Sequence, residues 1–340
     1  MKLLIVTQRI DRDDANLGFF IRWVEAFAEQ CAEVVVIANE VKGVTWSHLN
    51  ISLRSLGKEK GASRFRRLLQ YRRILKEELP LSDGVFFHMC PEYAIAAGRL
   101  PHKFRKKSIL WYVHKEVSTR LRAATFLVSA IFTASRESCR LNSHKIHIVG
   151  HGIDTTLPFS VRGAGESKHF VTVGRISPVK DLFTILRGFE RIQTALPDSD
   201  LSVIGEPITS VDCAYRAEML KQVTSPRIHW KSLPFGEAYN QSGYTAFVHA
   251  SRTGSMDKAV LEALAAGLPV FTSSEAFSNE IPGVTKFAEG NPADLAEKIA
   301  KAFEKGEIGY NEAGREWVKK YHNLDALVKK IVDFYRTGSR

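Results

Sequence analysis

Two cations, Arg175 and Lys180, lie five residues apart in the segment VGRISPVKD, just after a predicted strand that ends at Gly174. A helix is predicted to begin near Asp181, so both side chains would lie beside the free N–H groups of a helix N-terminus. Such a site suits a diphosphate, because the helix dipole attracts anions and the two cations add charge-assisted hydrogen bonds. The plainer alternative is a solvated loop in which Asp181 is an ordinary N-cap.

A second group of candidate residues lies in HASRTGSMDKAVLEALAAGLPVFTS, residues 249–273. A predicted strand leads into a Gly-Ser turn and then a helix, on which Glu262 follows Ser255 by seven residues and shares its face. A carboxylate there can accept hydrogen bonds from both hydroxyls of a ribose, while N–H groups of the turn bind phosphate or sugar hydroxyls. The alternative is that Glu262 and Lys258 form only a surface salt bridge, worth roughly 0.3 to 0.5 kcal/mol.

The elements that must position these residues are visible as short apolar, β-branched runs that alternate with helix-length amphipathic segments in both halves of the chain. This alternation predicts parallel sheets with crossover helices. We therefore expect an α/β protein with two doubly wound, Rossmann-like domains facing a cleft, and ligands at the carboxyl ends of the strands. The predicted strands are residues 2–7, 33–38, 84–89, 107–113, 130–135 and 145–150, followed by 169–174, 200–205, 227–232, 245–251 and 268–273.

The boundary between the two domains is expected in the stretch from His151 to Lys168, which lacks hydrophobic periodicity and contains several Gly and Pro residues. The expected domains are residues 1–155 and 165–322. Residues 323–340 are predicted to be helical, with one apolar face formed by Leu324, Leu327, Val328, Ile331 and Tyr335.

Positive charge is concentrated in the first half of the chain. The net charge is +11, and residues 1–160 hold 25 Lys and Arg against 15 Asp and Glu, whereas residues 161–340 hold 23 against 22. Such asymmetry indicates that the first half meets an anionic surface or ligand.

Two basic clusters carry much of this charge. Residues 54–76 are predicted to form a basic amphipathic helix, and HKFRKK at 102–107 adds four cations. We expect these clusters to dock the protein on an anionic membrane or to meet its acceptor. The alternative is an ordinary helix that buries one side while its arginines keep the protein soluble. The expected surface consists of Arg64, Arg66, Arg67, Arg72, Arg73, Lys103, Arg105, Lys106 and Lys107.

Several other protein classes are disfavoured. The four Cys are scattered and no metal-ligand spacing is present, so neither a metal nor another cofactor is expected. No G-x-G-x-x-G follows the first strand, which argues against a dinucleotide dehydrogenase, and the signatures of nucleic-acid binding are missing. Because the sequence shows neither a signal-peptide core nor an apolar run of membrane-spanning length, we expect a cytoplasmic protein with peripheral contact to the inner face of the membrane.

The motifs GRISPVKD and LEALAAGLPV, with an opening strand followed by a Gly-containing loop, resemble those of the family 4 glycosyltransferases. NLGFF at 16–20, WYVHKEV at 111–117 and the stretch from FTASRES to VGHGID at 132–154 extend the resemblance over the first half. The family implies the GT-B fold, a metal-independent retaining transfer from a nucleotide diphosphate sugar, and a closing helix that crosses back onto the N-terminal domain.

The resemblance also implies roles for individual residues of the second half. Arg175 and Lys180 match the pair that neutralises the leaving diphosphate next to Gly174, and Glu262 matches the carboxylate that holds the ribose hydroxyls. Leu233 matches a place where backbone groups meet the nucleobase.

Two matching positions lie in the first half. Gly18 matches a loop near the diphosphate, and His114 matches a histidine beside the donor sugar. The alternative for His114 is a hydrogen-bonded core histidine at a strand end.

One position departs from the family pattern. Family members commonly carry a glutamate eight residues before the equivalent of Glu262, and this chain has Gly254 there. The arrangement TGSMDK resembles a bacterial subgroup with a TGSxDK variant. The sugar contacts are then expected from Asp257 or from the backbone N–H groups of Ser255 and Met256.

The reaction that the resemblance implies is retaining transfer of a hexose from a nucleotide diphosphate sugar, with a UDP-sugar as the first choice. The acceptor is expected to be a saccharide or a lipid-linked saccharide, in polysaccharide or glycolipid biosynthesis. Two alternatives stay open: a sugar-nucleotide 2-epimerase of the same fold, and a non-catalytic protein that binds nucleotide sugars.

Overall fold

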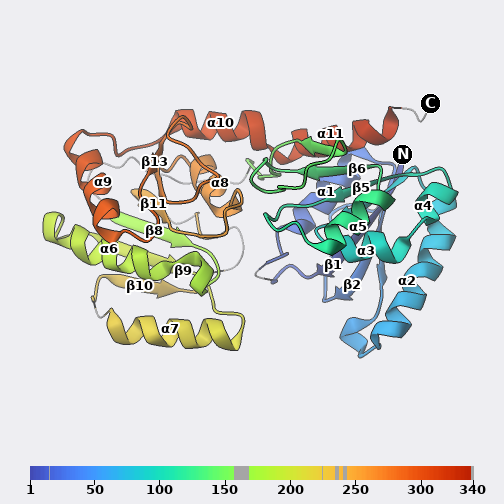
Figure 1. Ribbon diagram of the computed structural model, residues 1–340, viewed down its shortest axis with the longest axis horizontal. Coiled ribbons are helices and arrows are strands. Elements are labelled where there is room, and N and C mark those ends of the chain that lie inside the picture. Colours follow the sequence, from blue (N-terminus) through green and yellow to red (C-terminus); the bar gives the residue numbers. More distant parts are fainter. Residues whose placement is uncertain (15, 157–167, 224, 234–236, 240–242, 338–340) are drawn as a thin grey trace. The chain divides into compact units, whose positions relative to one another are not determined.

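The computed structural model describes the chain except for residues 15, 157–167, 224, 234–236, 240–242 and 338–340 (Figure 1). It divides into two compact units, Met1–Asp154 with His322–Arg340, and Thr155–Tyr321. Most of the expected linker, residues 151–168, lies outside the described residues.

The first unit is built on a seven-stranded sheet in the order β3-β2-β1-β4-β5-β6-β7, with every pair of neighbours parallel. Its strands are β1 (Lys2–Ile10), β2 (Glu33–Val41), β3 (Ile51–Ser55), β4 (Gly84–His88), β5 (Lys107–Trp111), β6 (Ala130–Thr133) and β7 (Ile146–Ile148). The strand order reverses between β1 and β4, which is where doubly wound sheets bind ligands.

Helices cover both faces of this sheet, so the buried parts of its central strands are apolar. Leu3 and Ile5 of β1 pack towards α1 and α11, while Leu4 and Val6 pack with residues of α2, α3 and α5 on the other face. The helices are α1 (Phe20–Gln30), α2 (Arg64–Glu78), α3 (Pro91–Ala97), α4 (Leu100–Lys103), α5 (Thr119–Leu127) and α11 (Leu324–Arg336).

The last helix of the chain, α11, belongs to the first unit and packs beside α1. Its predicted apolar face is buried in one core with the strands, and the phenol of Tyr335 donates to the carbonyl of Val85 over 2.7 Å. The ammonium of Lys107 donates to the carbonyls of Phe334 and Thr337 at the end of the helix. Strand and helix residues far apart in the sequence therefore share one hydrophobic core.

The second unit contains a six-stranded parallel sheet in the order β10-β9-β8-β11-β12-β13. Its strands are β8 (His169–Val173), β9 (Asp200–Ile204), β10 (Ile228–Lys231), β11 (Ala246–His249), β12 (Val270–Thr272) and β13 (Val284–Lys286). Its helices are α6 (Leu182–Ala195), α7 (Ser210–Gln222), α8 (Lys258–Ala265), α9 (Pro292–Glu304) and α10 (Glu312–His322). Strand order here reverses between β8 and β11.

Two parts of the element prediction were wrong. The edge strands β3 and β13 were not predicted, because both are short and only partly buried and lack a long apolar run. The basic helix expected over 54–76 begins only at Arg64, where Ser63 caps it, because Gly57 and Gly61 take left-handed backbone conformations before it. Among the described helices, none combines the length and apolar character needed to cross a bilayer.

Candidate functional site

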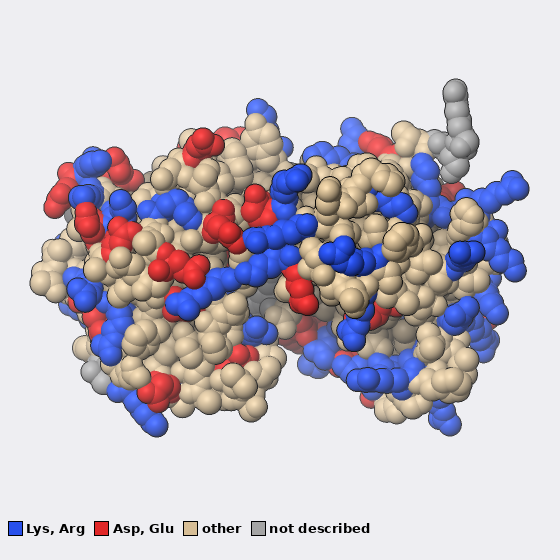
Figure 2. Space-filling view, viewed as in Figure 1, with Lys and Arg blue, Asp and Glu red and all other residues tan. Residues whose placement is uncertain are grey.

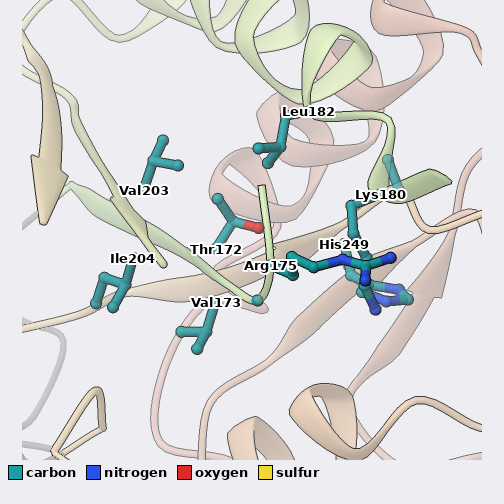
Figure 3. A pocket seen from close by; sticks show the side chains of 10 residues that line it. Thr172, Val173, Arg175, Lys180, Leu182, Val203, Ile204 and His249 are labelled. Carbon is teal, nitrogen blue, oxygen red and sulfur yellow. The ribbon is translucent and has the colours of Figure 1, made fainter. Parts of the chain in front are cut away.

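The candidate site lies in the second unit, at the carboxyl ends of β8, β9 and β11. A pocket there has about 270 Å³ of empty space, including its open mouth. Figure 3 shows Arg175, Lys180 and His249 among the side chains that line it. Gly205, with φ +144°, lets the chain after β9 approach Gly174 closely, since a Cβ at Gly205 would lie 2.0 Å from the Gly174 carbonyl oxygen.

The loop that carries the two cations is held by side chains. Asp181 has φ +45° and precedes α6, but its carboxylate makes no hydrogen bond to the helix backbone. Its Oδ2 instead accepts hydrogen bonds from Arg252, over 2.7 and 3.1 Å, and from the Thr184 hydroxyl over 2.8 Å. The backbone N–H of Arg252 also donates to Val179 over 2.8 Å. Asp181 therefore stabilises the loop through its hydrogen bonds to Arg252 and Thr184, and it is not an ordinary N-cap.

Lys180 forms an ion pair with Asp257, the residue that precedes α8. The side chains of Lys180 and Asp257 are 21% and 15% exposed. His249 donates to the same carboxylate, with 3.1 Å between Nε2 and Oδ2, and its Nδ1 lies 2.9 Å from the Thr272 hydroxyl. Asp257 thus holds the ammonium of Lys180 beside the pocket, and His249 in turn orients the carboxylate of Asp257.

The protonation of this group follows from its environment. Burial lowers the pKa of His249, so the ring is neutral near pH 7. A carboxylate only accepts hydrogen bonds, which places the ring proton on Nε2 and makes Nδ1 an acceptor from Thr272. Burial alone would raise the pKa of Asp257, but the charge of Lys180 and the hydrogen bond from His249 lower it well below its usual range.

Arg175 is held more loosely than Lys180. Its side chain is 39% exposed, and its Nε lies 3.9 Å from the carboxylate of Asp212. Asp212 is otherwise occupied in a capping box with Thr209 at the start of α7. The guanidinium is therefore available to an anion in the pocket.

Glu262 and Lys258 form an ion pair over 2.8 Å, with both side chains less than one-fifth exposed. The salt bridge weighed against a ribose contact is thus present, although it is more buried than a surface pair. One carboxylate has enough lone pairs to accept from Lys258 and from a diol together.

The turn between β11 and α8 places Gly254 and Met256 in buried positions and Ser255 in a partly buried one. Gly254 has φ +62°, a conformation that a glutamate adopts only with strain. Leu233, partly buried, lies just after β10, and within the described part of the chain no hydrogen bond or ion pair joins it to the other predicted donor residues.

The two predicted residues of the first unit have clear local roles. Gly18 packs against the backbone, since a Cβ there would lie 2.6 Å from the Arg12 carbonyl oxygen. His114, after β5, is exposed, and its Nδ1 accepts from the N–H of Glu116 over 3.1 Å. It is therefore not a core histidine.

Two of the nine residues of the expected basic surface bind other parts of the first unit. Lys107 binds the end of α11, and Arg67 donates to the Asn39 side chain. Figure 2 shows Lys and Arg side chains gathered along the side of the first unit that carries α2 and α4. Phe65 and Leu69 on α2 are 68% and 54% exposed among these cations.

Sequence reasoning missed His249 and Arg252 as members of the site. A histidine at the end of an otherwise apolar strand was the available signal for His249. The partner of Arg252, Asp181, lies 71 residues away, and no local pattern reveals such a pair. Among the described residues no group of three or more His, Cys, Asp or Glu side chains could hold a metal ion.

The chain thus folds into two doubly wound parallel α/β units, and the second unit has paired cations at its strand ends. Several solved structures share this two-unit architecture. Alr3699/HepE of Anabaena, solved with UDP, is 12% identical and matches 99% of this chain and 100% of its own, with a TM-score of 0.77. A mutant of TarM of S. aureus, solved with Fondaparinux, alpha-GlcNAc-glycerol and UDP, is 9% identical over 99% and 100%, with a TM-score of 0.75. A glycosyltransferase from Rickettsia africae is 12% identical over 98% of each chain, with a TM-score of 0.73.

These likenesses confirm the expected GT-B fold. Residues 167–305 match the family model described as Glycosyl transferases group 1, which lies within the second unit and covers less than half of the chain. No curated protein matches the chain closely in sequence. The family match and the fold together support a glycosyltransferase family, while the narrower family 4 resemblance stays a prediction.

Proposed function

We propose that this protein is a glycosyltransferase that moves a hexose from a nucleotide diphosphate sugar to a saccharide or lipid-linked saccharide. The observation that carries the proposal is the pair Arg175 and Lys180 at one pocket, within the segment that matches the group 1 glycosyltransferases. A UDP-sugar is the first candidate donor, because HepE and TarM were solved with UDP.

Breaking the bond between sugar and diphosphate develops negative charge on the leaving group. Lys180 has three N–H donors and gives one to Asp257, so two remain for phosphate oxygens. Arg175, at the start of the same loop, adds a planar guanidinium with several N–H donors. These charges replace a metal in the proposed mechanism and stabilise the transition state more than the bound donor.

The remaining donor contacts follow the resemblance. Glu262 would accept from the ribose hydroxyls, and backbone groups at Leu233 would meet the base. Asp257 or the backbone N–H groups of Ser255 and Met256 would contact the donor sugar. From the first unit, Gly18 would approach the diphosphate and His114 the sugar.

The proposed reaction retains the anomeric configuration. The acceptor hydroxyl attacks the face from which the diphosphate departs and gives its proton to the leaving phosphate. A glycosidase-type mechanism would need two carboxylates that flank the bond. In the second unit, Asp257 is paired with Lys180 and Glu262 with Lys258, so neither carboxylate stands ready as a nucleophile.

We further propose that the first unit docks on anionic lipid through α2, where lipid-linked acceptors reside. The exposed Phe65 and Leu69 can enter the interface while neighbouring arginines meet the headgroups. This would make the protein a peripheral protein of the cytoplasmic membrane face.

The test is a panel of UDP, GDP and ADP sugars, first by thermal shift and then by release of nucleotide diphosphate with a mixture of acceptors. A donor at about 100 times its Kd should stabilise the second unit by roughly 2.7 kcal/mol. Conversion of the sugar without an acceptor would establish the epimerase instead, although the match to group 1 glycosyltransferases favours transfer. Binding without any release of diphosphate would establish a non-catalytic binding protein.

A further inference from the structure

A cluster of polar side chains outside the donor site lies on the first unit, at the carboxyl ends of β1 and β2. Gln8 and Asn39 lie side by side there, between the register pairs Thr7–Ala38 and Arg9–Glu40. They continue the rows Leu4–Val6 and Val35–Ile37, which face α2 and α3. Both polar side chains therefore project from one face, next to those helices.

Arg67 of α2 reaches this edge. Its Nη1 donates to the Asn39 Oδ1, while its Nε is fully buried and has no hydrogen-bond partner. Within the described residues the guanidinium forms no ion pair. The neighbouring acid, Glu40, is already bound by Arg9 over 2.9 Å and by Lys58 over 2.6 Å. A partly buried cation without a counter-charge is costly unless an anion completes the site.

The groups around Arg67 are hydrogen-bond donors. Because Asn39 accepts from Arg67 through Oδ1, its N–H₂ group is left as a donor. Tyr93 of α3 donates to the Gln8 Oε1 over 2.7 Å, which leaves the N–H₂ group of Gln8 as a donor too. Burial raises the pKa of Tyr93, and the nearby charge of Arg67 counteracts that rise. No carboxylate is hydrogen-bonded to these four side chains in the described part of the chain.

We propose that Arg67, Asn39 and Gln8 form a subsite for an oxyanion, a phosphate or carboxylate group carried by the acceptor. The inference rests on the proposed function only in naming the acceptor as the ligand. It places an acidic saccharide or a saccharide phosphate on the first unit, near the point where its strand order reverses. Tyr93 is a positioning residue that fixes the Gln8 amide.

The experiment uses the full chain saturated with UDP, so that the donor site is occupied. Inorganic phosphate and, in a parallel series, acetate are titrated at constant ionic strength against chloride, and the arginine Nε–Hε signals are followed by NMR. We expect one saturable signal, assigned by its absence in Arg67→Gln, to move with phosphate or acetate. The anion that shifts the Arg67 signal at the lower concentration shows whether the subsite prefers a phosphate or a carboxylate group.

Arg67→Gln should weaken that anion by roughly tenfold or more, as expected for loss of one charged hydrogen-bond partner. Arg122→Gln, on the exposed side of α5, is the matched control and should bind the anion as the unchanged protein does. If Arg67→Gln does not fold, Arg67→Lys, which keeps the positive charge but also lacks the Nε–Hε group, assigns the signal instead.

The subsite would be overturned if neither phosphate nor acetate gave a saturable shift larger than that of chloride. It would also be overturned if Arg67→Gln bound the anion as tightly as the wild type does. UDP binding is measured in the same samples. Loss of UDP binding with a persistent Arg67 shift would contradict the proposed function and leave the anion site standing. UDP binding without an Arg67 shift would contradict the subsite alone.

Discussion

At the scale of single residues, the site depends on how one lysine is held. Lys180, Asp257 and His249 come from the loop after β8, the start of α8 and the end of β11. The cation pair of the second unit was predicted from spacing alone, because Arg175 and Lys180 follow a recognisable strand end. The ion pair with Asp257 was not predicted, because its partners lie 77 residues apart.

Lys180→Ala should lower transfer from the donor on the order of 100-fold, because it removes one charged group that stabilises the departing diphosphate. The measurement is kcat with the best donor from the nucleotide-sugar panel. Lys301→Ala, an exposed lysine of α9, serves as the control. Near-normal turnover in Lys180→Ala would remove this residue from the mechanism.

Asp257→Asn should destabilise the second unit by about 3 kcal/mol at pH 7, since it leaves a largely buried ammonium without its charge partner. The pKa of Asp257 is lowered in the folded protein, so its contribution is present above the unfolded pKa near 4 and is lost as the pH falls further. Urea unfolding of the wild type and the variant at pH 7 and at pH 3 measures the destabilisation and its decrease at low pH. A variant as stable as the wild type at pH 7 would show that the pair is not stabilising.

His88 gives the first unit a pH dependence of its own. It is stacked on Phe20 with ring centroids 3.7 Å apart, and burial lowers its pKa to about 3. The folded state therefore excludes the charged ring, and stability should fall by about 1.4 kcal/mol for each pH unit below 6.5, until the folded pKa is reached.

His88→Gln should reduce this slope between pH 6.5 and 4.5, as measured by urea unfolding across that range. The burial of His322 also lowers its pKa, to about 4, so a smaller slope remains in the variant. An unchanged slope would mean that His88 titrates normally in the folded chain.

At the scale of elements, the central strands and the edge strands β7 and β10 were predicted, whereas the edge strands β3 and β13 were not. Central strands such as β1 and β4 are buried on both faces along most of their length, so each contains an unbroken apolar run. The edge strand β3 has no fully buried residue and contains no such apolar run. The start of α2 was missed because the basic composition of the segment continues through the turns before Ser63.

The exposed part of α2 should bind anionic vesicles at low salt. A variant with Phe65→Ser, Leu69→Ser, Arg66→Gln and Arg72→Gln should lose most of this binding in co-sedimentation, because it removes both the apolar and the charged contacts. Arg191→Gln with Lys221→Gln removes the same charge from exposed helices of the second unit as a control. Equal sedimentation of both variants would rule out docking through α2.

At the scale of the whole chain, the last helix completes the first unit although the chain reaches it only after the second. Ile331 is fully buried in the core that α11 shares with α1. The apolar face of α11 could be predicted from hydrophobic periodicity. Periodicity alone does not show which of the two cores that face packs against.

Ile331→Ala should therefore destabilise the first unit by about 3 kcal/mol, as expected for a large-to-small change in a packed core. Hydrogen exchange read separately on the two units measures this effect. Faster exchange confined to the second unit would contradict the assignment of α11 to the first core.

The most direct test of the central claim is a crystal structure of the protein with UDP. We predict that the diphosphate lies within hydrogen-bond distance of both Lys180 and Arg175, at the carboxyl ends of β8 and β11, and that the ribose hydroxyls donate to Glu262. A diphosphate bound away from both cations, or a ribose out of reach of Glu262, would contradict it.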